Sequence, residues 1–247
     1  MPKHNNRKST IRLSHPKLKA LANKIRDEKL REKVIDLLEN PTFEIGGEKH
    51  VGLPLEISPA GLSHHHSYQG GYLEHVVSST DIALALCNSV EKVYGGKVNR
   101  DLVVAGVLLH DIFKPIIYVM NENGSFSKTR LADYMDHLSI IISELVRREF
   151  PLEIIHAVSA HHGEYGPIRP RTVEALICHL ADLIDSRLNG EILNAARYLA
   201  RRAIGEELFE LTSKEAFEII NSKSVEGWEG VAKAVEKIRR KRKTHKA

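Results

Sequence analysis

The chain has 247 residues, of which 42% are hydrophobic and 28% are charged, and its formal net charge is +4. This composition excludes a disordered chain, and no apolar run approaches the roughly 20 residues of a membrane-spanning helix. Met1 is followed by polar and basic residues rather than an apolar signal core. We therefore expect a cytoplasmic protein with one principal domain.

The positive charge is concentrated at the two ends of the chain. Residues 1–9 carry +3 and residues 237–247 carry +7, which leaves −6 for the residues between them. An acidic body does not predict a broad nucleic-acid surface. The basic tail is either a solvated, disordered end, which is the commoner case, or a contact for RNA or another anionic surface.

The first 60 residues predict a helical extension and a short hairpin. Between residues 15 and 38, apolar residues at helical spacing indicate one or two amphipathic helices, which end at Pro41. Near residues 42–57, short apolar stretches alternate with Gly and Pro, which is typical of a hairpin or an extended insert. We expect a sheet in this segment alone.

After Gly70 the hydrophobic pattern is helical, with breaks at Gly, Asn and Pro. The chain is therefore predicted to be an all-α helical bundle with one small insert. The predicted helices span residues 72–94, 100–112, 130–149, 152–161, 171–188, 190–204, 206–211, 213–222 and 227–242. We divide the chain into an N-terminal extension (1–60), a metal-binding core (61–190), C-terminal helices packing on that core (191–236) and the basic tail (237–247).

Histidine is concentrated in the middle of the chain, because all but four of the 14 histidines lie between His64 and His179. Several lie, with two aspartates, in or beside different predicted helices, so a folded bundle would have to bring them together. Imidazole and carboxylate without thiolate suit a divalent metal such as Fe, Mn, Co, Ni or Zn. The candidate ligands are His75, His110, Asp111, His137, His161, His162 and Asp182.

Each candidate also has an ordinary structural interpretation. His75 would be unremarkable as a half-buried histidine, and His161-His162 as a surface pair. His110-Asp111 is the strongest signal, because the pair ends the apolar run from Val103 to Leu109 and would be desolvated without a partner. A metal ion would supply that partner.

The order of these motifs resembles the HD superfamily of metal-dependent phosphohydrolases. The resemblance covers about half of the chain, from His64 to Leu188, although Phe113 stands where the family usually has Gly. The motifs are Gly70-Gly71-Tyr72-Leu73-Glu74-His75, Leu108-Leu109-His110-Asp111-Ile112-Phe113-Lys114-Pro115, Asp136-His137, His161-His162-Gly163-Glu164 and Leu180-Ala181-Asp182-Leu183-Ile184-Asp185.

The resemblance implies two metal ions joined by Asp111. His75, His110, Asp111 and Asp182 would hold the first ion, while Asp111, His137, His161 and His162 would hold the second. Fe²⁺ or Mn²⁺ is expected first, with Zn²⁺, Co²⁺ or Ni²⁺ as alternatives.

The predicted chemistry is attack on phosphorus by a metal-activated hydroxide, for which Asp111 is the central catalytic residue. Lys114, three residues after Asp111, would add positive charge near the phosphoryl group, unless it is an ordinary surface lysine.

Two further segments are candidates for substrate binding. One contains His65, His66 and Tyr68, and one of the two histidines would donate to a phosphate or a leaving oxygen. The other is a loop from Gly163 to Arg171, in which Arg169 and Arg171 would clamp a phosphate or face solvent. His156 and His179 are expected to pack or to support ligands.

Two enzyme hypotheses compete. The first is a phosphodiesterase for a small-molecule phosphate ester, similar to the archaeal family that opens the 2′,3′-cyclic phosphate of dihydroneopterin in pterin biosynthesis. The second is a 3′-to-5′ exoribonuclease, similar to bacterial enzymes that join an HD domain to an OB fold, for which residues 1–60 are too short and too helical. A nucleotidase or phosphomonoesterase also fits the ligands, whereas a non-catalytic scaffold does not explain why the set is complete. The oligomeric state is not predicted.

Overall fold

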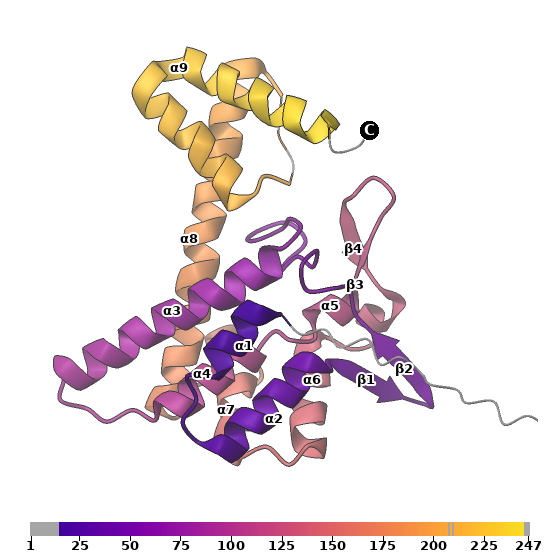
Figure 1. Ribbon diagram of the computed structural model, residues 1–247, viewed down its shortest axis with the longest axis vertical. Coiled ribbons are helices and arrows are strands. Elements are labelled where there is room, and N and C mark those ends of the chain that lie inside the picture. The colour runs from indigo at the N-terminus through magenta and orange to yellow at the C-terminus, as the bar shows by residue number, and fades with distance from the viewer. Residues whose placement is uncertain (1–14, 207, 209, 245–247) are drawn as a thin grey trace, which may run out of the picture.

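The computed structural model of the chain describes residues 15–206, 208 and 210–244. It is predominantly helical, which confirms the predicted all-α fold class, and none of the described helices is long and apolar enough to cross a membrane (Figure 1). The elements in chain order are α1 (Pro16–Ala22), α2 (Glu28–Glu39), β1 (Thr42–Ile45), β2 (Glu48–Val51), α3 (Gly71–Lys92), α4 (Arg100–Leu109), α5 (Lys114–Ile117), β3 (Tyr118–Met120), β4 (Phe126–Lys128), the 3₁₀-helix η1 (Arg130–Asp133), α6 (His137–Arg147), α7 (Leu152–Ser159), the 3₁₀-helix η2 (Gly163–Tyr165), α8 (Val173–Ile204) and α9 (Ser213–Thr244).

The N-terminal extension forms the predicted pair of helices and the predicted hairpin. Asp27 begins α2 by accepting a hydrogen bond from the Leu30 amide at 2.9 Å, as expected of an N-cap aspartate. Strands β1 and β2 are antiparallel, with Ile45 opposite Glu48. Gly46 and Gly47 turn the chain with φ of 60° and 80°, values that glycine adopts without steric cost.

A second hairpin was not predicted, so the expectation of a single sheet is wrong. Strands β3 and β4 pair Tyr118 with Lys128 and Met120 with Phe126. Each strand has three residues, and both lie between the predicted helices 100–112 and 130–149, where no element was predicted. A pattern this short does not distinguish a strand from a helix.

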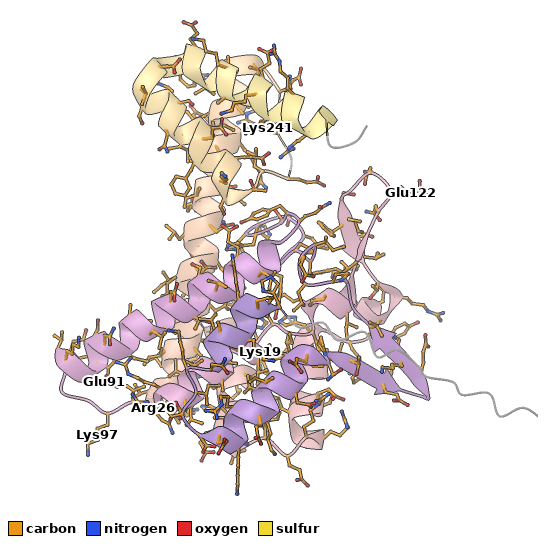
Figure 2. All side chains as sticks on the ribbon, viewed as in Figure 1. Lys19, Arg26, Glu91, Lys97, Glu122 and Lys241 are labelled. Atoms are coloured by element: carbon orange, nitrogen blue, oxygen red, sulfur yellow. The ribbon has the colours of Figure 1, made fainter. Side chains whose placement is uncertain are left out.

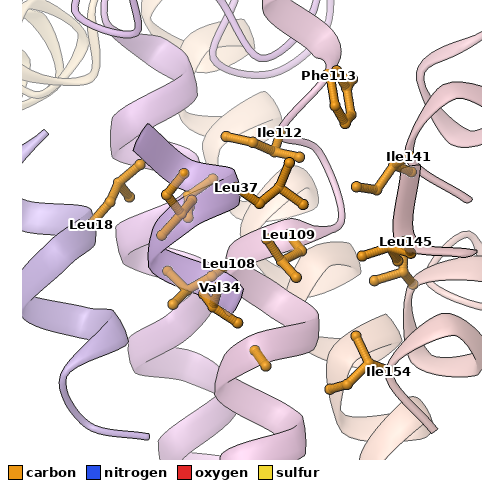
Figure 3. Close-up of a cluster of buried hydrophobic side chains, with 14 of the residues drawn as sticks. Leu18, Val34, Leu37, Leu108, Leu109, Ile112, Phe113, Ile141, Leu145 and Ile154 are labelled. Atoms are coloured by element: carbon orange, nitrogen blue, oxygen red, sulfur yellow. The ribbon is translucent and has the colours of Figure 1, made fainter. Parts of the chain in front are cut away.

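Helix α4 lies at the centre of the helical body and is buried on every side. Leu108 and Leu109 face a large cluster that contains Leu18 of α1, Val34 of α2 and Ile141 of α6 (Figure 3). The opposite side of α4 packs on a second cluster that includes residues of α7 and α8. A helix that is apolar all round is expected to be buried, and truncating one of its leucines to alanine would cost about 2–5 kcal/mol. The body therefore holds the C-terminal end of α4 rigidly.

Helix α8 is continuous over 32 residues, so the predicted break at Asn189-Gly190 is wrong. An interior glycine costs a helix only about 1 kcal/mol, which packing on both sides of it offsets. Gly205, with φ of 74°, ends the helix. The described residues of the predicted helix 206–211 are not helical, because Leu208 and Leu211 instead fill a cluster between α8 and α9.

The C-terminal half of α8 carries α9 outside the helical body (Figure 1). Gly227 has a non-helical backbone and divides α9 at the position where we predicted two helices. Together the C-terminal half of α8 and α9 form a unit with its own apolar cluster, which we call the α8–α9 unit. The division of the chain into four parts, with residues 191–236 packing on the metal-binding core, stays a prediction.

The basic end of the chain is helical as far as Thr244, in line with the helix predicted over residues 227–242. The alternative of a disordered end is therefore wrong for residues 237–244. Ile238 is buried in the α8–α9 unit. Lys241 lies exposed on α9, and Glu122 lies at the tip of the β3–β4 hairpin (Figure 2). Residues 245–247 of the predicted tail are outside the described residues.

Candidate metal centre

The predicted histidine-aspartate pair lies where the sequence places it, at the end of buried helix α4. His110 is 2% exposed and Asp111 is fully buried. The chain turns there into α5, and the Lys114 amide donates to the Asp111 carbonyl at 2.9 Å. The rigid body thus presents a carboxylate and an imidazole that are both removed from water.

A first group of ligands comes from three long helices. The ligand atoms of His75 in α3, His110 after α4 and Asp182 in α8 all lie within 4.8 Å of one another. His75 Nε2 is 3.2 Å from His110 Nε2 and 3.3 Å from Asp182 Oδ1. The Ser186 hydroxyl, one turn along α8, donates to Asp182 Oδ1 at 3.2 Å and orients it. This geometry can hold one metal ion.

A second group consists of imidazoles from α6 and the end of α7. The ligand atoms of His137, His161 and His162 also lie within 4.8 Å of one another. His137 is the first residue of α6, whose N-cap Asp136 accepts from the Ser139 amide at 2.7 Å. His179 Nδ1 donates to the His161 carbonyl at 2.7 Å, which steadies the turn that carries the histidine pair.

Asp111 lies between the two groups and turns one oxygen toward each. Its Oδ2 atom is 3.4 Å from His75 Nε2 and 3.3 Å from His110 Nε2. Its Oδ1 atom is 3.2 Å from His137 Nε2 and 3.9 Å from His161 Nε2. A carboxylate placed in this way can bridge two metal ions.

Three of the histidines have their second ring nitrogen occupied. His75 Nδ1 is 2.7 Å from Asp185 Oδ2, His110 Nδ1 is 2.7 Å from the Val107 carbonyl, and His161 Nδ1 is 2.7 Å from the Val158 carbonyl. A carbonyl or carboxylate there accepts a hydrogen bond from the Nδ1–H group. Nε2 is then the ring nitrogen that faces the centre and can bind a metal ion. Asp185 therefore supports His75.

The buried polar atoms of the centre fit a metal ion. Asp111 Oδ1, His137 Nε2 and His161 Nε2 are buried, yet none makes a hydrogen bond of good geometry among the described residues. Buried polar atoms without such bonds are destabilising. A metal ion at each group would remove this penalty.

Comparison with known proteins agrees with this geometry. The HD domain profile matches residues 72–187, which contain every ligand described above. Over 169 residues the chain is 46% identical to the dihydroneopterin 2′,3′-cyclic phosphate phosphodiesterase of Methanocaldococcus jannaschii. The aligned region covers 68% of each chain. The chain belongs to the HD domain family. It is a phosphohydrolase. HD domains bind divalent metal ions, and this chain has His and Asp groups that could hold them.

Bacterial relatives are more distant. The chain is 34% identical over 176 residues to the 3'-5' exoribonuclease YhaM of Oceanobacillus iheyensis, which covers 66% of this chain and 53% of that protein. It is 38% identical over 144 residues to YhaM of Listeria monocytogenes, covering 53% of this chain and 43% of that protein. The matched region thus spans about half of these exoribonucleases. A comparison with solved structures finds no significant match.

Negative charge gathers around the first ligand group of the HD domain. Burial lowers the pKa of His75, but contacts with Asp111, Asp182 and Asp185 outweigh burial and raise this pKa well above its ordinary value. Burial raises the pKa of Asp111, but Lys114 and His110 outweigh burial, so this pKa lies well below its ordinary value. Three carboxylates around one imidazole make a site that attracts cations.

Lys114 is buried and faces the bridging carboxylate. Its Nζ atom lies 2.5 Å from Asp111 Oδ2. Burial lowers the pKa of Lys114, but Asp111 and Asp182 outweigh it and raise the pKa above its ordinary value. The ammonium group is therefore charged, and Lys114 is not an ordinary surface lysine.

In the segment predicted to bind substrate, the two histidines lie beside the candidate centre, whereas Tyr68 lies in the apolar cluster of the α8–α9 unit. The rings of His65 and His66 each lie 5.3 Å from the ring of His75, so both residues border the centre. Burial lowers the pKa of each to about 3, which leaves both imidazoles neutral at pH 7. Tyr68 is 2% exposed and its hydroxyl is 2.6 Å from Ser213 Oγ. This burial does not favour direct substrate contact, and the assignment of Tyr68 stays a prediction.

The loop from Gly163 to Arg171 lies beside the second ligand group. Its Arg169 is exposed and lies 4.0 Å from Glu164, and Arg171 is exposed as well. His156 accepts a hydrogen bond from the Arg171 amide at 2.9 Å and so anchors the end of the loop. The structure brings neither guanidinium into the contacts of the centre, and their phosphate-binding role stays a prediction.

Sequence reasoning missed Asn189, which was interpreted as part of a helix break. Asn189 is 5% exposed, and its Oδ1 accepts from the His66 amide at 2.6 Å. A buried polar residue inside a helix signals a long-range hydrogen bond, but the sequence does not say to which residue.

Proposed function

We propose that the chain is a phosphodiesterase that hydrolyses a small cyclic phosphate ester, with dihydroneopterin 2′,3′-cyclic phosphate as the first candidate. The observation that carries the proposal is the pair of ligand groups that share Asp111 through different oxygens. The similarity to the Methanocaldococcus jannaschii enzyme, which extends over 68% of both chains, supports this substrate class.

In this proposal each ligand group holds one ion. His75, His110 and Asp182, together with Asp111, would hold the first ion. His137, His161 and His162, again with Asp111, would hold the second. Fe²⁺ and Mn²⁺ suit this mixture of imidazole and carboxylate, as do Zn²⁺, Co²⁺ and Ni²⁺. When bound, such ions provide hydroxide at neutral pH and neutralise charge on phosphoryl oxygens.

The chain's own residues then position the ester. Hydrolysis forms one bond from a water oxygen to phosphorus and breaks one ring P–O bond, and the leaving oxygen takes up a proton. The charged Lys114 ammonium stabilises the negative charge that grows on the phosphoryl group. A neutral imidazole such as His65, which is half-buried beside His75, can donate a hydrogen bond to the leaving oxygen.

The exoribonuclease alternative rests on the YhaM relatives and on the basic end of the chain. Four side chains in that end are paired with acids, so they attract an RNA backbone less than their number suggests. The pairs are Lys237–Glu218, Arg239–Glu206, Arg240–Glu236 and Arg242–Glu215. This pairing favours the small-molecule reaction. Two buried free cysteines, Cys87 and Cys178, suit a reducing compartment such as the cytoplasm.

The test combines metal analysis with a choice of substrates. Protein purified without oxygen is analysed for metal, loaded with Fe²⁺ or Mn²⁺, and given a 2′,3′-cyclic phosphate, a phosphomonoester and a short RNA. The proposal predicts about two ions per chain and preferential opening of the cyclic phosphate. Stepwise shortening of the RNA at a higher kcat/KM would instead establish the exoribonuclease.

A further inference from the structure

Tyr68 joins the segment at the metal centre to the α8–α9 unit. Its side chain is 2% exposed and belongs to the apolar cluster of that unit. The other described members of the cluster all come from residue 192 onwards, in α8, α9 and the connection between them. Tyr68 directly follows His66-Ser67, so the α8–α9 unit contacts the substrate-side edge of the centre through this residue.

Asn189 links these two parts of the molecule by hydrogen bonds. Its Oδ1 accepts from the His66 amide at 2.6 Å, and its Nδ2 donates to Ser213 Oγ at 2.7 Å. The Tyr68 hydroxyl is 2.6 Å from Ser213 Oγ and 3.4 Å from Asn189 Nδ2. We call these three side chains the Asn189 network. It connects α8, the first residue of α9 and the backbone of His66, and all of it lies outside residues 72–187.

The backbone at His66 needs such support. Its φ is 45°, a left-handed conformation that a non-glycine residue adopts only when its surroundings impose it. The His66 carbonyl accepts from the Ala60 amide at 3.1 Å and lies so close to Gly71 that a Cβ atom there would be 2.1 Å away. The Asn189 network holds the amide of the same residue, so both the N–H and the C=O group of His66 are fixed.

This conformation sets the position of two imidazoles. His66 Nδ1 is 3.7 Å from Asp185 Oδ2, the carboxylate that supports His75. His65 Nδ1 is 3.4 Å from His66 Nδ1, so the two rings are arranged together against the first ligand group. A change of φ at His66 would move both rings.

We propose that the Asn189 network positions His65 and His66 for the reaction. The α8–α9 unit then contributes to the geometry of the active site. Asn189, Tyr68 and Ser213 are positioning residues that act through the two histidines. The inference rests on the proposed function, since it assigns His65 and His66 to the substrate side of the metal centre.

The kinetic test uses the metal-loaded full chain and a 2′,3′-cyclic nucleotide. Asn189→Leu removes both hydrogen-bonding atoms, Tyr68→Phe removes one hydroxyl, and Ser213→Thr keeps the hydroxyl that Ser213→Ala deletes. We expect Asn189→Leu to lower kcat by about 10- to 100-fold with unchanged metal content, because small misplacements of positioned groups have effects of this size. Ser213→Thr should recover most of the loss in Ser213→Ala.

Matched controls lie on the same helices. Ser224→Ala removes a hydroxyl of α9 that, among the described residues, donates to the Ile220 carbonyl one turn away. Tyr198→Phe removes the hydroxyl of an exposed tyrosine of α8. Both should keep the wild-type kcat. If Ser213→Ala and Tyr68→Phe behave like these controls, the proposal is wrong.

A second background separates positioning from stability. In a chain that carries His65→Ala and His66→Ala, the network has no imidazoles to position, so adding Asn189→Leu should not lower kcat further. The same fold loss in this background would show that Asn189 acts on the fold as a whole and would overturn the proposal.

A measurement without turnover keeps the inference distinguishable from the proposed function. Diethyl pyrocarbonate modifies accessible imidazoles, and mass spectrometry locates the modified residues. In the wild type the 2%-exposed His66 and His110 should be protected and the exposed His64 modified. Asn189→Leu should expose His66 while His110 stays protected. Continued protection of His66 in that variant would overturn the inference even if no substrate has been identified.

Discussion

The two ligand groups of the metal centre use the same imidazole chemistry in different electrostatic surroundings. The first group contains Asp182, is supported by Asp185 and raises the pKa of His75. In the second group, burial and neighbouring imidazoles lower the pKa of His161 well below its ordinary value, and the acid within reach is Asp111. The first group therefore attracts a cation by itself, whereas the second depends on the shared carboxylate.

The largest expected effect comes from removing the residue that the groups share. Asp111→Ala should lower kcat/KM by about 10³-fold or more and remove most of the bound metal, because both ions lose a ligand. Metal analysis and steady-state kinetics check this, with the exposed Asp133→Ala as control. Retained turnover with two ions per chain would rule out the shared-ligand arrangement.

Removing a ligand from the second group should cost less bound metal than removing a ligand from the first group. His162→Ala should leave about one ion per chain and lower activity by at least about 10²-fold, since two-ion chemistry needs both positions. His75→Ala should remove metal more completely, because His75 lies in the first ligand group, which attracts a cation by itself. Equal metal loss in the two variants, measured by elemental analysis, would contradict the asymmetry.

Lys114 tests chemistry separately from metal binding. Lys114→Ala should lower kcat by about 10²-fold while metal content stays nearly intact, because the ammonium stabilises developing charge and is not a ligand. Lys114→Arg serves as the charge-preserving comparison. If Lys114→Ala loses metal, its role is to balance the charge of Asp111.

A change at Asp185 tests the first ligand group separately, because Asp185 supports His75 of that group. Asp185→Asn should weaken metal affinity or activity by about 10- to 100-fold, the usual effect of losing the partner of a ligating histidine. Titration of the metal-free protein with Mn²⁺ measures it, and the exposed Asp81→Asn provides the control. An unchanged first binding constant would show that Asp185 does not tune His75.

The smallest effect is expected far from the centre, on the basic end of α9. The double variant Arg240→Gln and Lys241→Gln should change hydrolysis of a small cyclic phosphate by less than about twofold, since exposed charges there contribute at most about 1 kcal/mol each. Activity on RNA is measured in parallel at two salt concentrations. A salt-dependent loss confined to RNA would favour the exoribonuclease instead.

Much of the fold was predictable because helical periodicity is a local property. The ranges of α3, α4 and α7 follow from the spacing of apolar residues and from breaks at Gly and Pro. The β3–β4 hairpin was not predictable, because strands of three residues carry too short a pattern. The continuity of α8 through Gly190 was not predictable either, because packing there outweighs a weak local preference.

The types of the candidate ligands and their order along the chain could be predicted from the sequence, since a histidine-aspartate pair at the end of a buried helix requires a compensating partner wherever it lies. The tertiary structure alone decided that Asp111 turns one oxygen toward each group and that Asn189 reaches the His66 amide. Those contacts join residues far apart in the chain, so they depend on how the helices pack and not on any local pattern of residues.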